Sequence, residues 1–292
     1  MLNQAKIKIV ECPRDAMQGW PKQIPTDVKI EYLNTLLKVG FDTLDFGSFV
    51  SAKAIPQLSD TKEVLKELDL KGSSTKLLAI IANKRGAEEA ANYKEIDFLG
   101  YPFSISETFQ LKNTNSTIKD SMKLVEEIQS SCLRSGKKLV IYISMGFGNP
   151  YGDPWNSEIA INYVKSIASL GVATISLADT VGVSTPENIR HLFGALIPLF
   201  PSVEFGAHLH SHPNKWEEKI KACADSGVSR FDTAMHGIGG CPMADDVLVG
   251  NIATENVVRF FGGASTMGLD ENAYRLAGEM ALGVFDKKMT AS

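Results

Sequence analysis

The chain has 292 residues, of which 44% are hydrophobic, and its 30 Lys and Arg against 34 Asp and Glu give a formal net charge of −4. This apolar share suffices for a large core and excludes a wholly disordered chain. The slight acidic excess argues against general binding to nucleic acid or to an anionic membrane surface. No run of about 18 consecutive apolar residues occurs, so no membrane-spanning helix is expected.

The amino terminus and the cysteines both point to the cytoplasm. The opening MLNQAKIKIVECPRD passes from a short polar lead into a strand-like run, without the basic end, apolar stretch and small-residue cleavage site of a signal peptide. The cysteines are scattered and include no CxxC pair; they are Cys12, Cys132, Cys223 and Cys241. This is the pattern of reduced thiols, so we expect a cytoplasmic protein.

Short β-rich runs alternate with amphipathic helices along the chain. The run KLLAIIA (residues 76–82) is continuously apolar, as is typical of a parallel strand that is covered on both faces. Strands are predicted over residues 7–12, 41–47, 76–82, 95–103, 138–145, 174–180, 204–210 and 230–235. Helices are predicted over residues 26–39, 58–68, 84–93, 117–135, 156–170 and 214–226, after Pro186, and near 253–261 and 271–285.

This alternation predicts an α/β protein with a (β/α)₈ TIM barrel, because eight strands interleaved with helices is the count for that fold. We expect one catalytic domain over residues 1–292, with additional C-terminal helices from about residue 252 packed on the barrel. The alternative is a doubly wound open sheet, which would want a Gly-rich loop after the first strand. The segment in that position, PRDAMQ, contains no glycine.

Polar residues at the carboxyl ends of barrel strands are the candidates for chemistry. His208 and His210 lie two apart on a predicted strand, so both side chains point to the same face. An HxH pair alone is a weak pattern, and two unrelated polar residues at a strand end are the alternative. The carboxylate of Asp15 and the amide of Asn251 favour a chelating set. Two imidazole nitrogens plus oxygens suit Mg²⁺ or Mn²⁺, or an open zinc site.

Two further residues stand at strand ends. Arg14 offers fixed donors to a carbonyl oxygen that gains negative charge, although a surface ion pair with Asp15 is the plainer interpretation. Cys241 lies in GIGGCP, a glycine-rich stretch from which a thiol could enter and leave a site and transfer a proton. The alternative is that Cys241 is an inert small residue.

Several motifs in order resemble one family. The segments PRDAMQ, GSFVSAKAIPQLSD, SISETFQLKN, SLADTVGVSTP, AHLH, GIGGCP and GNIATEN have the order and approximate spacing seen in 3-hydroxy-3-methylglutaryl-CoA (HMG-CoA) lyase. The match runs from about residue 7 to residue 265. Any one motif is weak, whereas the ordered set is specific. The resemblance extends to the metal-dependent barrel enzymes that include the isopropylmalate, citramalate and homocitrate synthases.

The resemblance implies a divalent-metal-dependent enzyme that cleaves HMG-CoA, an acyl-CoA substrate, to acetyl-CoA and acetoacetate. By analogy with the relatives it also implies a homodimer. The roles it implies fall into three sets. The metal ligands are Asp15, His208, His210 and Asn251, the catalytic residues are Arg14, Cys241, Asp45 and Asp179, and the substrate-binding residues are Gln18, Ser48 and Glu255.

The chain departs from the family pattern at several places, one of which is GWPK at residues 19–22, where a lysine usual in the family a few residues after PRDG is absent. Ala16 stands where the family has the glycine of PRDG, which predicts a different turn because Ala does not readily take a positive φ. Asp45 replaces a glutamate, and residues 211–214 read SHPN where the family has approximately DTYG. These changes bear on the substrate more than on the reaction, so another 3-hydroxyacyl-CoA is a possible substrate. Two alternatives remain, a Claisen-type synthase that joins acetyl-CoA to a 2-keto acid and a barrel that has lost catalysis.

Overall fold

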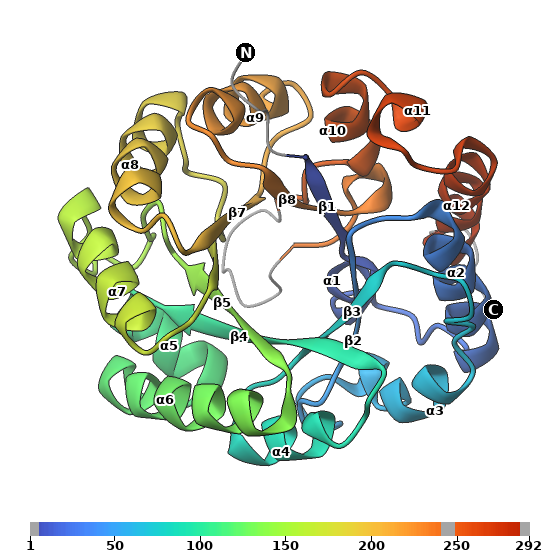
Figure 1. Ribbon diagram of the computed structural model, residues 1–292, viewed down its shortest axis with the longest axis horizontal. Helices are drawn as coiled ribbons and strands as arrows, with labels where there is room; N and C mark the ends of the chain where they lie inside the picture. The colour runs from blue at the N-terminus through green and yellow to red at the C-terminus, as the bar shows by residue number, and fades with distance from the viewer. Residues whose placement is uncertain (1–5, 241–248, 287–292) are drawn as a thin grey trace.

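A computed structural model describes residues 6–240 and 249–286. Its strands are all parallel and close into a barrel in chain order, which confirms the predicted TIM barrel (Figure 1). The strands are β1 (Lys8–Glu11), β2 (Thr43–Ser48), β3 (Lys76–Ile80), β4 (Ile96–Ser104), β5 (Lys138–Ser144), β6 (Thr174–Asp179), β7 (Glu204–Leu209) and β8 (Arg230–Thr233).

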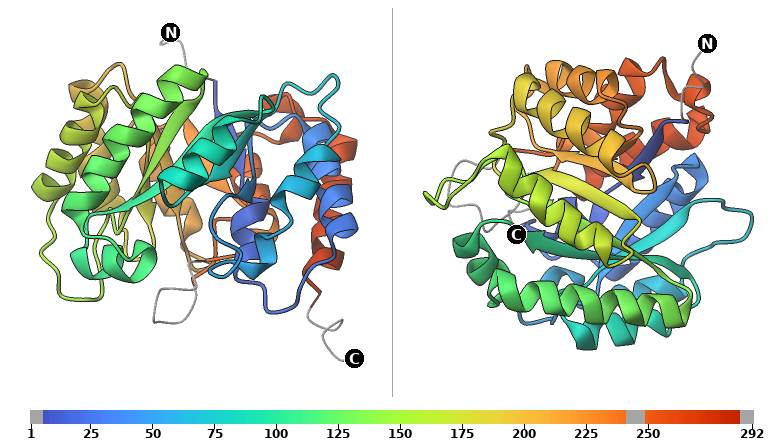
Figure 2. Two further views of the ribbon diagram at one scale, coloured as in Figure 1. Left: turned by 90° about the horizontal axis from the view of Figure 1, so that it is seen from below. Right: turned by 60° about the vertical axis from the view of Figure 1, so that its left-hand side comes forward.

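The helices form an outer layer around the strands (Figures 1 and 2). They are α1 (Pro13–Gln18), α2 (Thr26–Val39), α3 (Thr61–Lys66), α4 (Lys84–Ala91), α5 (Glu107–Thr114), α6 (Ile118–Ser135), α7 (Ser157–Ser169), α8 (Pro186–Leu199), α9 (Trp216–Asp225), α10 (Thr254–Phe260), α11 (Ala264–Met267) and α12 (Glu271–Val284). The sequence pattern missed α1, α5 and α11, which are short helices.

Most of the hydrophobic core lies between the strands and the outer helices. A separate, smaller cluster contains Leu78, Ile80, Phe98, Val140 and Tyr142, contributed by β3, β4 and β5. The inner face of a barrel strand is normally filled by bulky side chains, and this cluster fills that side of the cylinder. Because this cluster fills the interior beside β3, β4 and β5, polar side chains from the other strands can point inward at the barrel mouth.

The segment PRDAMQ forms a helix instead of the turn that the sequence suggested. Pro13 occupies the first turn of α1, where a missing backbone N–H costs nothing. Ala16 is buried inside this helix and does not have a positive φ. Ala16 therefore suits this helix, and α1 fixes Arg14 and Asp15 on a rigid element at the barrel mouth.

The C-terminal helices pack on the barrel. The ring of Phe285, just after α12, meets the edges of Trp20 and Tyr32 at centroid distances of 5.2 and 6.2 Å. These contacts hold α12 against α2. Within residues 6–240 and 249–286, no helix is both long and apolar enough to span a bilayer. Cys12, Cys132 and Cys223 are all buried free thiols.

Glu11, at the end of β1, is buried and ties the first strand to the chain that follows β8. Its carboxyl group accepts hydrogen bonds from the backbone N–H of Met235 at 2.8 Å and from the hydroxyl of Thr254. Burial raises the pKa of Glu11 from 4.5 to about 8, although both hydrogen bonds act in the opposite direction. At neutral pH this carboxyl group is therefore mostly protonated.

Replacing Glu11 with Gln should flatten the dependence of stability on pH. The folded protein keeps the Glu11 proton up to about pH 8, whereas the unfolded chain releases it near pH 4.5. Between these values the folded state binds more protons, so its free energy of unfolding falls as the pH rises, by at most about 1.4 kcal/mol per pH unit. Urea unfolding across this range measures the slope, and an equal slope in Glu11→Gln would contradict the prediction.

Candidate active site

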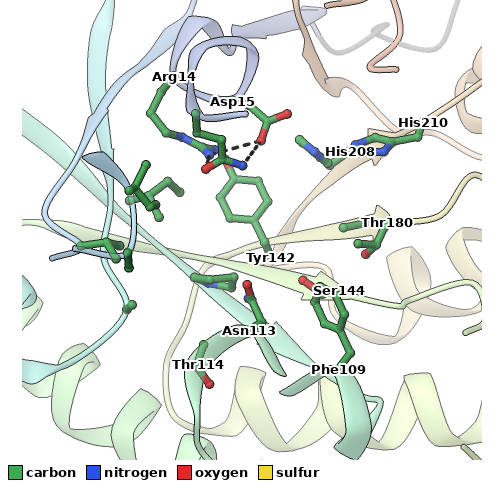
Figure 3. A pocket seen from close by; sticks show the side chains of 18 residues that line it. Arg14, Asp15, Phe109, Asn113, Thr114, Tyr142, Ser144, Thr180, His208 and His210 are labelled. Atoms are coloured by element: carbon green, nitrogen blue, oxygen red, sulfur yellow. Dashed lines mark hydrogen bonds and ion pairs between the residues drawn. The ribbon is translucent and has the colours of Figure 1, made fainter. Parts of the chain in front are cut away.

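A cavity of about 200 Å³ opens among the loops at the carboxyl ends of the strands (Figure 3). Its polar lining includes Arg14, Asp15, Gln18, Thr180, His208 and His210. Much of the remaining lining is apolar and comes from Val50, Ala54, Ile55, Ile80, Ala82 and Phe109. The cavity therefore combines charged and imidazole groups with hydrocarbon walls, as small-molecule sites commonly do.

Asp15, His208 and His210 converge in this cavity. Each offers one ligand atom, and these atoms all lie within 4.8 Å of one another. His208 lies on β7 and His210 directly follows it in an extended bridge, so both imidazoles point inward, and α1 carries Asp15 to meet them (Figure 3). Asn251 reaches the same place because its backbone forms an antiparallel bridge with His210. The structure thus brings together all four predicted metal ligands.

The two histidines differ in their hydrogen-bond partners and in the shift of their pKa. The Nδ1 atom of His208 lies 3.2 Å from Asp232 Oδ2, which leaves Nε2 for a ligand. Burial tends to lower the pKa of His208, but the hydrogen bond and charge of Asp232 raise it overall. His210 Nε2 is buried without a hydrogen-bond partner, and burial lowers the pKa of His210 to about 4. A neutral, unpartnered imidazole nitrogen fits a metal ion, which would supply the missing partner.

Asp15 is held as a carboxylate. Burial tends to raise its pKa, but the charges of Arg14, His208 and His210 and a hydrogen bond from Asn251 bring the pKa below the ordinary value. The Asn251 amide nitrogen donates to Asp15 Oδ2 at 2.7 Å and to the Ile238 carbonyl at 3.0 Å. Among the described residues no hydrogen bond reaches the Asn251 amide oxygen, so that oxygen remains available to a cation.

Arg14 is fixed by three neighbours. Its Nε and Nη2 atoms donate to the carboxylate of Asp45 at 2.6–3.2 Å, and Nη1 donates to Asp15 at 3.2 Å and to Gln18 at 2.8 Å. These bonds use four of the five N–H donors of a guanidinium, leaving one on Nη2. Burial raises the pKa of Asp45 to about 6 despite the charge of Arg14, so Asp45 is ionised at neutral pH.

Five of the predicted site residues that the structure describes do not themselves line the cavity. Asp45 and Asn251 contact residues that do, through Arg14 and Asp15. The other three are Ser48, Asp179 and Glu255. The hydroxyl of Ser48 accepts the N–H of Val50 at 3.2 Å. The carboxylate of Asp179 accepts a hydrogen bond from Lys219, and Glu255 accepts the backbone N–H of His236. Cys241 lies outside the described residues, so its predicted role stays a prediction.

Sequence reasoning missed two residues at the site. Tyr142 lines the cavity, its hydroxyl is buried without a partner, and its ring meets the His208 ring edge-on at 5.7 Å. An inward tyrosine in the apolar run KLVIYIS was the available signal. Asp232 on β8 supports His208, and only the register that pairs His208 with Asp232 reveals that contact.

Comparison with known proteins identifies the family of this chain. The HMGL-like family profile matches residues 6–272. The cytoplasmic 3-hydroxy-3-methylglutaryl-CoA lyase of Rattus norvegicus is 32% identical over 90% of this chain and 76% of the relative.

Two solved structures are also similar. The hydroxymethylglutaryl-CoA lyase of Pseudomonas aeruginosa superposes with a TM-score of 0.88 at 29% identity, covering 97% of this chain and 94% of that one. An HMG-CoA lyase of Acinetobacter baumannii, solved with coenzyme A and 3-methylmalate, gives 0.87 at 26% identity, covering 100% of this chain and 97% of that one. The chain therefore belongs to the HMGL-like family.

Proposed function

We propose that this protein is a divalent-metal-dependent carbon–carbon lyase that cleaves HMG-CoA, or a closely related 3-hydroxyacyl-CoA, to acetyl-CoA and acetoacetate or its homologue. One observation carries the proposal. A fixed arginine and a chelating set of one carboxylate and two imidazoles line the same cavity. The HMG-CoA lyases similar to this chain support the substrate class, and one of them was solved with coenzyme A.

Cleavage of the C2–C3 bond requires that a hydroxyl lose its proton and that the negative charge of an enolate be stabilised. The tertiary hydroxyl loses its proton as the C3 ketone forms, and the electron pair of the C2–C3 bond moves into a thioester enolate. Arg14 can stabilise the enolate oxygen through its remaining Nη2 donor, because Asp45 and Gln18 already fix the guanidinium plane. The enolate carbon then takes a proton, and we assign that donation to the Cys241 thiol, following the family resemblance.

The metal site would hold Mg²⁺ or Mn²⁺ through Asp15, His208, His210 and Asn251. A bound divalent ion supplies Lewis-acid charge that lowers the pKa of the substrate hydroxyl. The buried charges around the site favour a divalent ion. Four carboxylates, of Asp15, Asp45, Asp179 and Asp232, face two fixed cations, Arg14 and Lys219. Two further positive charges would balance this set.

Other roles extend the proposal. Gln18 lines the cavity beside Arg14 and is placed to bind substrate. Ser48 and Glu255 do not line the cavity. Ser48 accepts the N–H of Val50, which does line it, and Glu255 accepts the N–H of His236, so we assign both an indirect role in substrate binding. We further propose a single catalytic domain, a cytoplasmic location and a homodimer, in analogy with the relatives.

An assay with two substrate sets separates the lyase from a synthase. Purified protein with Mg²⁺ should release acetoacetate from HMG-CoA, and a chelator should abolish the release. Turnover of acetyl-CoA with a 2-keto acid, without cleavage of any 3-hydroxyacyl-CoA, would overturn the lyase assignment.

Replacing Arg14 with Gln should lower the kcat of acetoacetate release by about a hundredfold or more, because one preorganised donor to a developing oxyanion contributes roughly that factor. Arg275 on α12 is an exposed arginine that pairs with Glu279, so Arg275→Gln serves as the matched control and should keep its activity. Equal activity of Arg14→Gln and the control would contradict the role of Arg14.

Replacing Asp232 with Asn should weaken Mn²⁺ binding by roughly 10–100-fold, because the carboxylate orients His208 and increases its basicity. Calorimetric titration of Mn²⁺ measures the affinity, and circular dichroism checks that the variant is folded. Asp225→Asn, at an exposed position on α9, is the control. Unchanged Mn²⁺ affinity in a folded Asp232→Asn protein would show that His208 does not depend on this contact.

A further inference from the structure

A buried lysine lies beneath the end of β7. Lys219 extends from α9, and its ammonium group donates to the carbonyl oxygen of His210 at 2.9 Å, to Asp179 Oδ2 at 2.8 Å and to the carbonyl oxygen of Gly182 at 3.2 Å. The three contacts use all three N–H donors of the group. One side chain thus joins α9 to the ends of β6 and β7.

These contacts fix the peptide that carries a proposed metal ligand. Lys219 holds the carbonyl oxygen of His210, and the N–H of Ser211 in the same peptide group donates to the carbonyl oxygen of Gly250 at 3.1 Å. Gly250 precedes Asn251, whose backbone bridges to His210. The peptide between His210 and Ser211 is therefore held from both sides, by α9 and by the segment that brings in Asn251.

Asp179 serves as the counter-ion in this arrangement. Its carboxylate accepts Lys219 and also the N–H and hydroxyl of Ser184 at 2.5–3.1 Å, and it does not line the cavity. A buried ammonium close to a divalent cation is unfavourable unless a carboxylate neutralises it. Asp179 supplies that charge, and its oxygen atoms face protein donors.

We propose that Lys219 is a positioning residue of the metal site, and that Asp179 acts through Lys219 as its counter-ion and not on the substrate. The proposal rests on the proposed function for the identity of the site. It also explains why a lysine lies on the buried face of α9 together with Trp216, Ile220 and Cys223, a face that is normally apolar.

A double-mutant cycle tests this arrangement in the full chain. Lys219→Met, Asp179→Asn and the double variant are compared for Mn²⁺ affinity by calorimetry, for kcat and KM, and for amide hydrogen exchange over residues 204–215. Lys221→Met is the matched control, because Lys221 lies on the same helix but is exposed and pairs with Asp225. The double variant leaves neither buried charge unpaired, so it also provides a folded reference should a single variant fail to fold.

We expect Lys219→Met to speed exchange at residues 210–212 and to weaken Mn²⁺ binding about tenfold or more, with the double variant no worse than Lys219→Met. Losses in kcat/KM that multiply in the double variant would mean that Asp179 acts on the substrate independently, which overturns the proposal. Unchanged Mn²⁺ affinity and exchange in Lys219→Met would overturn it as well. A wild-type protein that binds no Mn²⁺ would instead defeat the proposed function, while the exchange data would still test the hold of Lys219 on His210.

Discussion

The site depends on keeping a carboxylate and two imidazoles together in a buried place. The ligand atoms of Asp15, His208 and His210 lie within 4.8 Å of one another because β7 and the bridge residue that follows it turn both rings inward, and the closed barrel brings α1 to its mouth. Burial disfavours the charged forms of these groups, and neighbouring side chains stabilise two of them, Asp15 and His208. Arg14 and Asn251 hold Asp15, and Asp232 holds His208.

Among the buried polar atoms of this site that make no hydrogen bond, the Nε2 atom of His210 is the most informative. His210 Nε2 is buried and makes no hydrogen bond, although its carbonyl oxygen is held firmly by Lys219. Folded proteins rarely leave such an atom unpaired, and the exceptions gather at functional sites. Burying this nitrogen without a partner lowers the free energy of unfolding, and a bound cation would offset part of that loss.

The sequence predicts the candidate metal ligands but not the residues that hold them in place. The alternation of side chains in AHLH suffices to place both imidazoles on one face, and strand-end position suffices for Asp15. Asp232 depends on the register between β7 and β8, which no pattern along one strand reveals. Lys219 resembles an ordinary helical lysine until the packing of α9 shows that it is buried. The helix α1 escaped detection because it is short and five of its six residues are buried, so it shows no alternation of buried and exposed positions.

The most direct test of the central claim is anomalous diffraction from a crystal soaked with Mn²⁺. We predict a single strong manganese peak bound by oxygen of Asp15 and nitrogen of both His208 and His210, at about 2 Å from each, with the Asn251 amide oxygen turned toward the ion. Manganese bound elsewhere, or a metal peak that contacts none of these side chains, would contradict the account.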